Sequence, residues 1–238
     1  MQSSGRLLDG TKTWIQAQLD QAKKLGVRVL AMMHHGLIEH FAMQSVIFPE
    51  FVIGDRDALA GLLSNGGVGA ILTRHFHAND ITRGTPSTST KSIYDIETGS
   101  AVTYPCPYRI IDVVDDTLAI TTQHITSIDY DLGGKPDFQT LAHDSLRLGL
   151  EGLITKLIEA PPYSVSPADA ADLAPYLGDG LVAHYAGDEV MPDLAAAKAQ
   201  TLLSSTDFVM KLSGTMLQSI YSDLPPPDNA VVLDLAAR

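Results

Sequence analysis

The chain has 238 residues, of which 45% are hydrophobic and 18% are charged, a composition typical of globular proteins. Its formal net charge of −12 disfavours binding to nucleic acid, although a bound metal would still allow a small phosphorylated substrate. A single cysteine, Cys106, excludes an internal disulfide, and no apolar run reaches the roughly 18 residues of a membrane span. The first residues contain no apolar segment typical of a signal peptide, and the location of the protein stays open.

The first part of the chain predicts helices that alternate with strands. Residues 9–26 have helical spacing and end in lysines and a glycine, and the apolar run 27–33 predicts a buried strand. A second helix over 56–67 and a second strand over 68–73 follow. This order is typical of a βαβ unit with a parallel sheet.

The pattern changes after Ser92. Two hairpins are expected, one around the sequence ETGS and one around Asp115 and Asp116, and the remainder is mostly helical. We therefore expect an α/β region followed by an α-helical region. The expected divisions are the α/β region over 1–128, a linker over 129–137, the α-helical region over 138–226 and a C-terminal strand or tail over 227–238.

Histidines follow both predicted strands. The first strand leads into His34 and His35, and the second leads into His75 and His77. If the strands are parallel neighbours, these imidazoles gather at the carboxyl edge of the sheet, where open α/β sheets build ligand sites. In an extended segment His75 and His77 would project together, with Cα atoms ~6.5 Å apart. Neutral imidazole is the commonest metal ligand, so the pattern favours one or two bound metals over histidines satisfied by ordinary hydrogen bonds.

These motifs, in this order, resemble the C-terminal half of calcineurin-like metallophosphoesterases. VLAMMHHGLIEHF is similar to a strand of that family that ends in a metal-binding histidine, and ILTRHFHANDI is similar to its final Gly-His-x-His motif. IYDIETGSAVTYPCPYRII completes a resemblance that covers roughly residues 1–125. The helical region carries no motif of the family.

The resemblance implies part of a four-layer αββα sandwich and two divalent ions, which would be Mn, Fe or Zn. In the family a metal-bridging hydroxide attacks a small phosphate monoester or diester. Carried over by position, His34 and His75 would bind the second metal and His77 the first, while His35 would line the site. The metals would lower the pKa of water and neutralise charge on the phosphoryl oxygens.

Two departures from the family pattern bear on activity. Arg74 stands where the family has a glycine, so it would either distort the turn or reach the phosphate. The motifs Asp-x-His, Gly-Asp-x-x-Asp and Gly-Asn-His-Asp/Glu do not occur before His34, so we expect no catalytic residue in this chain. The expectation is a fragment with little activity alone, which would need an N-terminal half or another chain and could form a homo-oligomer through its open sheet edge.

The alternative is a non-catalytic relative of this family. Such a protein would use the sheet and the helical region as a binding or scaffolding surface, and its histidines would hold one structural ion or none. Arg74 favours this interpretation. The sequence alone leaves both open.

The remaining polar candidates are weaker. Asp80 could orient a metal-bound imidazole or cap a turn, and Arg109 could be structural or face the substrate. The sequence HHGLIEH does not match a zinc motif well enough to favour a separate site at His40. Histidines expected to have ordinary packing or surface roles are His124, His143 and His184.

Overall fold

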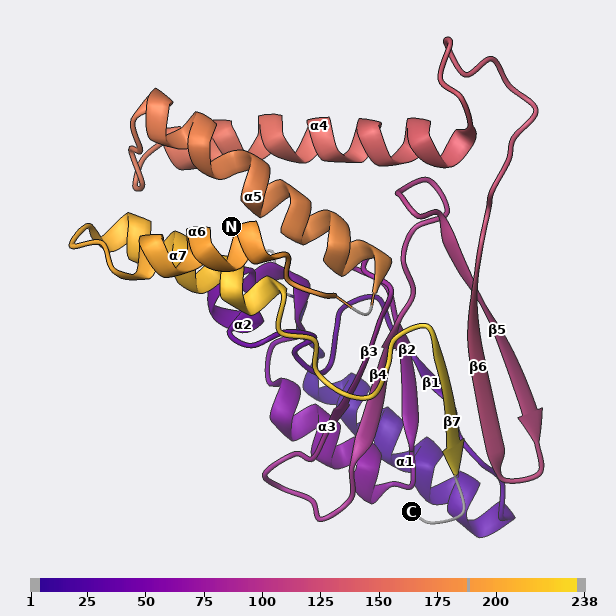
Figure 1. The fold of residues 1–238 in the computed structure, drawn as a ribbon. Coiled ribbons are helices and arrows are strands. Elements are labelled where there is room, and N and C mark those ends of the chain that lie inside the picture. Colours follow the sequence, from indigo (N-terminus) through magenta and orange to yellow (C-terminus); the bar gives the residue numbers. More distant parts are fainter. Residues whose placement is uncertain (1–4, 188, 235–238) are drawn as a thin grey trace.

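The computed structural model of the chain describes residues 5–187 and 189–234, and it is a mixed α/β fold followed by helices (Figure 1). Its N-terminal part alternates helices and strands, as predicted. In chain order this part contains α1 (Asp9–Leu25), β1 (Ala31–Met32), α2 (Gln44–Ile47), η1 (Pro49–Phe51), α3 (Arg56–Asn65), β2 (Ala70–Thr73), β3 (Asp80–Gly84) and β4 (Ile93–Glu97).

The first sheet has four strands in the order β1-β2-β4-β3. The prediction that the two histidine-bearing strands are parallel neighbours is confirmed, because Ala31 of β1 pairs with Ile71 of β2. The strand expected over 27–33 keeps only two paired residues, since β1 lies at the sheet edge and has one neighbour. β3, which pairs antiparallel with β4, was not predicted, because its polar residues gave no apolar run.

The second sheet has the order β5-β6-β7 and consists of β5 (Pro107–Val114), β6 (Thr117–His124) and β7 (Ala230–Asp234). The hairpin predicted around Asp115 and Asp116 is confirmed. The hairpin predicted at ETGS is wrong: β4 ends at Glu97 and pairs with β2 and β3 of the first sheet instead. The expected C-terminal strand is β7, which pairs with β6.

Helices and sheets stack in layers because alternate residues of a strand point to opposite faces. Ile71 and Ile93 of the first sheet pack with Leu59 of α3 and Leu19 of α1 on one face. On the other face, a second cluster joins the two sheets through the buried side chains of Ala70, Ile81, Ile96, Leu118, Ile120 and Leu233. The layers are therefore helices, first sheet and second sheet.

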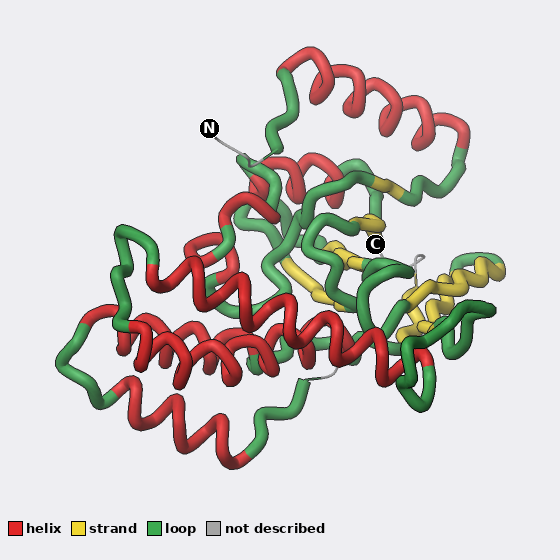
Figure 2. Tube along the Cα trace, turned by 90° about the horizontal axis from the view of Figure 1, so that it is seen from above, coloured by secondary structure: helices red, strands yellow, loops and turns green. Residues whose placement is uncertain are grey.

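The helical region consists of α4 (Phe138–Glu159), α5 (Pro167–Ala186), α6 (Asp193–Leu203) and α7 (Phe208–Ile220). Side-chain caps start three of these helices: Asp137 accepts a 2.8 Å hydrogen bond from Thr140 N, Ser166 accepts one from Asp169 N, and Asp207 accepts one from Val209 N. Figure 2 shows the four helices gathered on one side of the strands. None of the helices in the part of the chain that the structure describes is long and apolar enough to cross a membrane.

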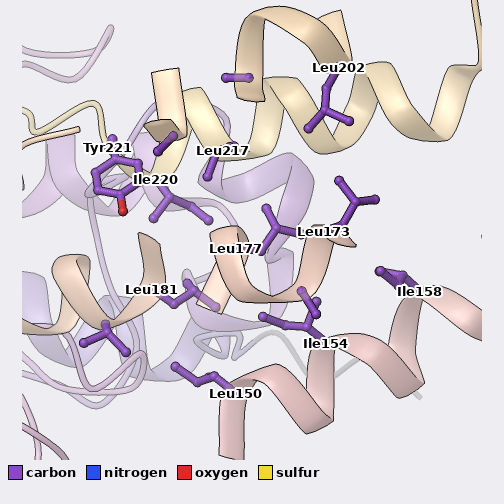
Figure 3. Close-up of a cluster of buried hydrophobic side chains, with 14 of the residues drawn as sticks. Leu150, Ile154, Ile158, Leu173, Leu177, Leu181, Leu202, Leu217, Ile220 and Tyr221 are labelled. Carbon is purple, nitrogen blue, oxygen red and sulfur yellow. The ribbon is translucent and has the colours of Figure 1, made fainter. Parts of the chain in front are cut away.

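The helical region shares its core with the α/β region. Leu177 of α5 and Leu217 of α7 point into this core together with Leu150 of α4 (Figure 3). The same buried cluster includes Phe41 and Phe76, which belong to loops of the α/β region. The two regions therefore bury one continuous apolar surface between them.

The edge at β1 is open and apolar. Met32 is 81% exposed and Trp14 of α1 is 62% exposed, and both line a groove of about 400 Å³ between α1 and β1. An edge strand also leaves backbone groups available for pairing with another strand. This edge adjoins the turn that carries His34.

Leu217→Ala is expected to lower the free energy of unfolding by ~2–5 kcal/mol, because it leaves a cavity in the core shared by both regions. Leu153→Ala is the control, since Leu153 of α4 is 62% exposed and its truncation should cost less than ~0.5 kcal/mol. Urea denaturation followed by tryptophan fluorescence and circular dichroism measures both. Two separate transitions in the wild-type protein would contradict a shared core.

Candidate functional site

Three imidazoles meet at the carboxyl ends of β1 and β2, as predicted. The ring centroid of His34 lies 4.4 Å from that of His75, and the ring of His35 lies 5.4 Å and 4.6 Å from these two. The backbone joins the two turns, because His34 O accepts hydrogen bonds from the N–H groups of Arg74 (3.2 Å) and His75 (2.9 Å). We call His34, His35, His75 and the neighbouring His77 the strand-edge cluster.

The second turn differs from its prediction. β2 ends at Thr73, and residues 74–77 form a turn closed by a 3.0 Å hydrogen bond from His77 N to Arg74 O. His77 has a φ of 66°, in the left-handed region. The prediction that His75 and His77 project together from an extended segment is therefore wrong, because the chain turns immediately after the strand.

Two imidazoles of this cluster, His75 and His77, favour the neutral form. Burial lowers the pKa of His75, and the nearby charges of His35, His34 and His77 lower it further. The pKa of His77 is lowered by burial and then by Arg74 and His34. Neutral imidazoles retain a lone pair that can bind a cation.

His35 has one ring nitrogen engaged with the backbone. Its Nε2 accepts a 3.1 Å hydrogen bond from Gly5 N, and a Cβ at Gly5 would lie 2.6 Å from the ring, so any larger residue there would displace the ring. The lining role of His35 stays a prediction. The metal-binding roles of His34, His75 and His77 stay predictions.

The three other candidates, Arg74, Arg109 and Asp80, lie at different places. Arg74 is exposed beside the strand-edge cluster. The guanidinium of Arg109 donates to the carbonyl oxygens of Asp228 (2.7 Å), Glu97 (2.8 Å) and Asp80 (3.2 Å), which is a structural arrangement that joins several segments. The Asp80 carboxylate is buried and contacts His40, not an imidazole of the strand-edge cluster.

A second group of polar side chains is buried between the first sheet and α5. Asp80 comes from β3, Asp95 and Glu97 from β4, and His184 from the last turn of α5. We call it the buried charge cluster, and its members are His40, Asp80, Asp95, Glu97, His184 and Glu189.

The expectation that His184 has an ordinary role is not what the structure shows, because it faces Asp80 and Glu189. His40 also belongs to this cluster, which the sequence did not favour. Sequence reasoning missed the cluster because its members are far apart along the chain. The alternation of Asp95 and Glu97 around buried Ile96 was the one local signal.

His40 lies among three carboxylates. Its Nδ1 lies 2.5 Å from Asp80 Oδ1, and its Nε2 lies 3.5 Å from Asp95 Oδ2 and 3.4 Å from Glu97 Oε2. On the other side of Asp80, His184 Nδ1 lies 3.9 Å from Asp80 Oδ2 and contacts Glu189 Oε1. Asp80 therefore lies between two imidazoles.

The charges of this cluster oppose the effect of burial. Burial alone would lower the pKa of His40, but Asp80 and Asp95 raise it well above its usual value. Burial would raise the pKa of Asp80, but His40 lowers it. Burial raises the pKa of Glu97 to about 7. His40 opposes this rise, whereas Asp95 and Asp80 add to it.

Asp95 connects the buried charge cluster to the strand-edge cluster. Its Oδ2 accepts hydrogen bonds from Leu37 N (2.5 Å) and Ile38 N (2.9 Å), and its Oδ1 accepts one from the Thr73 hydroxyl. These bonds hold the segment after His34 and His35 against the end of β2. The buried Asp95 carboxylate thus positions the turn that carries His34 and His35.

Two sets of potential metal donors occur among residues 5–187 and 189–234. The donor atoms within each set lie within 4.8 Å of one another, and the sets are Asp80–His184–Glu189 and Glu189–Asp223–Asp228. A buried Asp/His/Glu group that could bind a metal is therefore present. Neither set includes an imidazole of the strand-edge cluster.

Comparison of the chain with protein-family models and with curated proteins found no match. The comparisons therefore assign the chain to no family.

Glu97 is expected to make stability depend on pH. Its pKa of about 7 in the folded protein exceeds its usual 4.5. Its contribution to the free energy of unfolding is therefore fully present below pH 4.5 and is lost as the pH rises through 7. Relative to Glu97→Gln, the wild-type free energy of unfolding should fall by up to ~1.4 kcal/mol per pH unit across this window. Urea denaturation at several pH values in EDTA measures it.

Glu159→Gln is the matched control, because Glu159 is exposed at the end of α4. The control should follow the wild-type pH profile. A Glu97→Gln profile parallel to that of the wild type would show that Glu97 ionises normally in the folded protein.

Proposed function

We propose that this chain carries part of the metal centre of a calcineurin-like metallophosphoesterase that hydrolyses small phosphate monoesters or diesters. The observation that carries the proposal is the 4.4 Å separation of the His34 and His75 rings, at the ends of two parallel neighbouring strands. The order of the motifs supports it. The packing of two sheets with helices on one outer face is compatible with part of an αββα sandwich.

The donors of the strand-edge cluster fit a divalent ion in type. The lowered pKa values of His75 and His77 favour neutral imidazole, and Zn, Mn and Fe all accept it. In this proposal His34 and His75 hold one ion, and His77 holds the other. An ion bound there would lower the pKa of water and offset charge on the phosphoryl oxygens. Arg74 lies where its positive charge would attract the phosphate.

Balancing the charge of two divalent ions requires carboxylates in addition to neutral imidazoles. Neither described donor set contributes a carboxylate to the strand-edge cluster, so nothing there offsets the charge of two divalent ions. We propose that a carboxylate-bearing segment, from the same polypeptide or another chain, pairs with the open edge at β1. Its apolar side chains would cover Met32 and Trp14, and its carboxylates would reach the ions beside His34.

A non-catalytic module is the second candidate. Neither donor set of the described residues joins a carboxylate to these imidazoles, which favours it, as does Arg74 in place of glycine. Such a module would bind an ion without turnover.

His34→Ala/His75→Ala is expected to abolish tight binding of one Mn²⁺ or Zn²⁺ ion, because both imidazole donors are removed. The matched control is His124→Ala, since His124 is an exposed histidine at the end of β6. Isothermal titration calorimetry measures the number of ions bound. Equal binding by the double variant and the control would contradict a cation site at the strand-edge cluster.

Catalysis is tested with p-nitrophenyl phosphate and bis-p-nitrophenyl phosphate in the presence of Mn²⁺. The chain should be co-expressed with any adjacent coding segment that contains Asp-x-His and Gly-Asn-His. We expect Mn²⁺-dependent turnover from the complex, little from the chain alone, and none after His77→Ala. A complex that binds Mn²⁺ without turnover would overturn the proposed phosphoesterase function and favour the non-catalytic binding module.

A further inference from the structure

We propose that Asp80, His184 and Glu189 bind one divalent transition-metal ion, with zinc as the best match, at a structural site separate from the strand-edge cluster. This site would fasten the end of α5 to β3. It does not depend on the proposed phosphoesterase function.

The three residues converge in the interior. Asp80 lies on β3, His184 in the last turn of α5, and Glu189 shortly after that helix. Their donor atoms lie within 4.8 Å of one another. His184 Nδ1 faces both carboxylates, and the three side chains are 0–1% exposed.

Polar atoms at this place have no hydrogen-bond partner. Asp80 Oδ2, His184 Nε2 and Glu189 Oε2 are buried and unsatisfied within the described part of the chain. Such groups are rare in folded proteins because each one loses its hydration without compensation. A metal ion would bind to the lone pairs of Asp80 Oδ2 and Glu189 Oε2.

The interior also has an excess of acidic groups. Among the described residues, five acidic side chains are buried, against the two imidazoles of His40 and His184 and the half-buried guanidinium of Arg109. The acidic residues are Asp80, Asp95, Glu97, Glu189 and Asp228. Even with both imidazoles protonated and Glu97 neutral, negative charge remains, and a buried charge is costly unless it is paired. A divalent cation supplies the missing positive charge.

The donors identify the class of ion. One imidazole nitrogen with two carboxylate oxygens suits zinc and its transition-metal neighbours, whereas calcium and magnesium prefer oxygen ligands alone. The rings of Phe41 and Phe76 pack against that of His184, with centroids 5.0 Å and 5.4 Å away. Because these rings and the sheet close the site, no position is open to a substrate, and the ion would be structural.

The test uses the full chain produced in zinc-supplemented medium and passed over a chelating resin. Inductively coupled plasma mass spectrometry measures the zinc retained by His34→Ala/His75→Ala, by this variant with Glu189→Gln, and by this variant with Glu159→Gln. We expect one retained zinc in the first and third proteins. With Glu189→Gln, zinc affinity should fall more than ~100-fold. Losing an outer-shell partner already costs up to that much, and Glu189 is proposed as a direct ligand.

A second measurement covers the case in which Glu189→Gln does not fold. In the His34→Ala/His75→Ala protein grown with cobalt in place of zinc, the visible absorption spectrum should show a Co²⁺ ion bound by nitrogen and oxygen donors. Absence of retained zinc and of this spectrum would overturn the buried site. Retained zinc that is unaffected by Glu189→Gln in a folded protein would also overturn it.

Discussion

The buried carboxylates of Asp80 and Asp95 are the constraint on which the rest of the structure depends. A carboxylate in the interior must be paired or hydrogen-bonded, and these two find their partners in different parts of the chain. Asp95 binds the backbone N–H groups of Leu37 and Ile38, which fixes the turn that carries His34. Asp80 binds His40 and faces His184, which brings the helical region against the sheet. Both candidate sites are therefore positioned by the same buried charges.

The two clusters differ in exposure and charge, and this difference separates their proposed roles. The strand-edge cluster is partly open to solvent, and its His75 and His77 imidazoles favour the neutral form, which suits reversible contact with an ion and a phosphate. The buried charge cluster is closed by aromatic rings and has buried carboxylate oxygens without a hydrogen-bond partner, which suits the permanent binding of an ion. An acidic protein can thus present a locally cationic site to an anionic substrate only where metal and Arg74 supply the charge.

Hydrophobic periodicity and turn residues predicted the helices, strands and turns that form from neighbouring residues. The apolar run 68–73, the Asp115–Asp116 turn and the helices after Phe138 all appear where periodicity placed them. The meeting of His34 and His75 followed from parallel pairing, a topological rule. The turn at His77 could not be predicted, because a histidine gives no signal of positive φ. The contact between His184 and Asp80 joins distant segments through tertiary packing, which periodicity does not encode.

Anomalous diffraction from crystals grown with zinc, recorded above and below the zinc edge, shows whether the strand-edge imidazoles form a cation site. We expect an anomalous peak ~2.0–2.1 Å from ring nitrogens of both His34 and His75. Ordered rings at these two residues with no anomalous peak between them would contradict the proposed cation site.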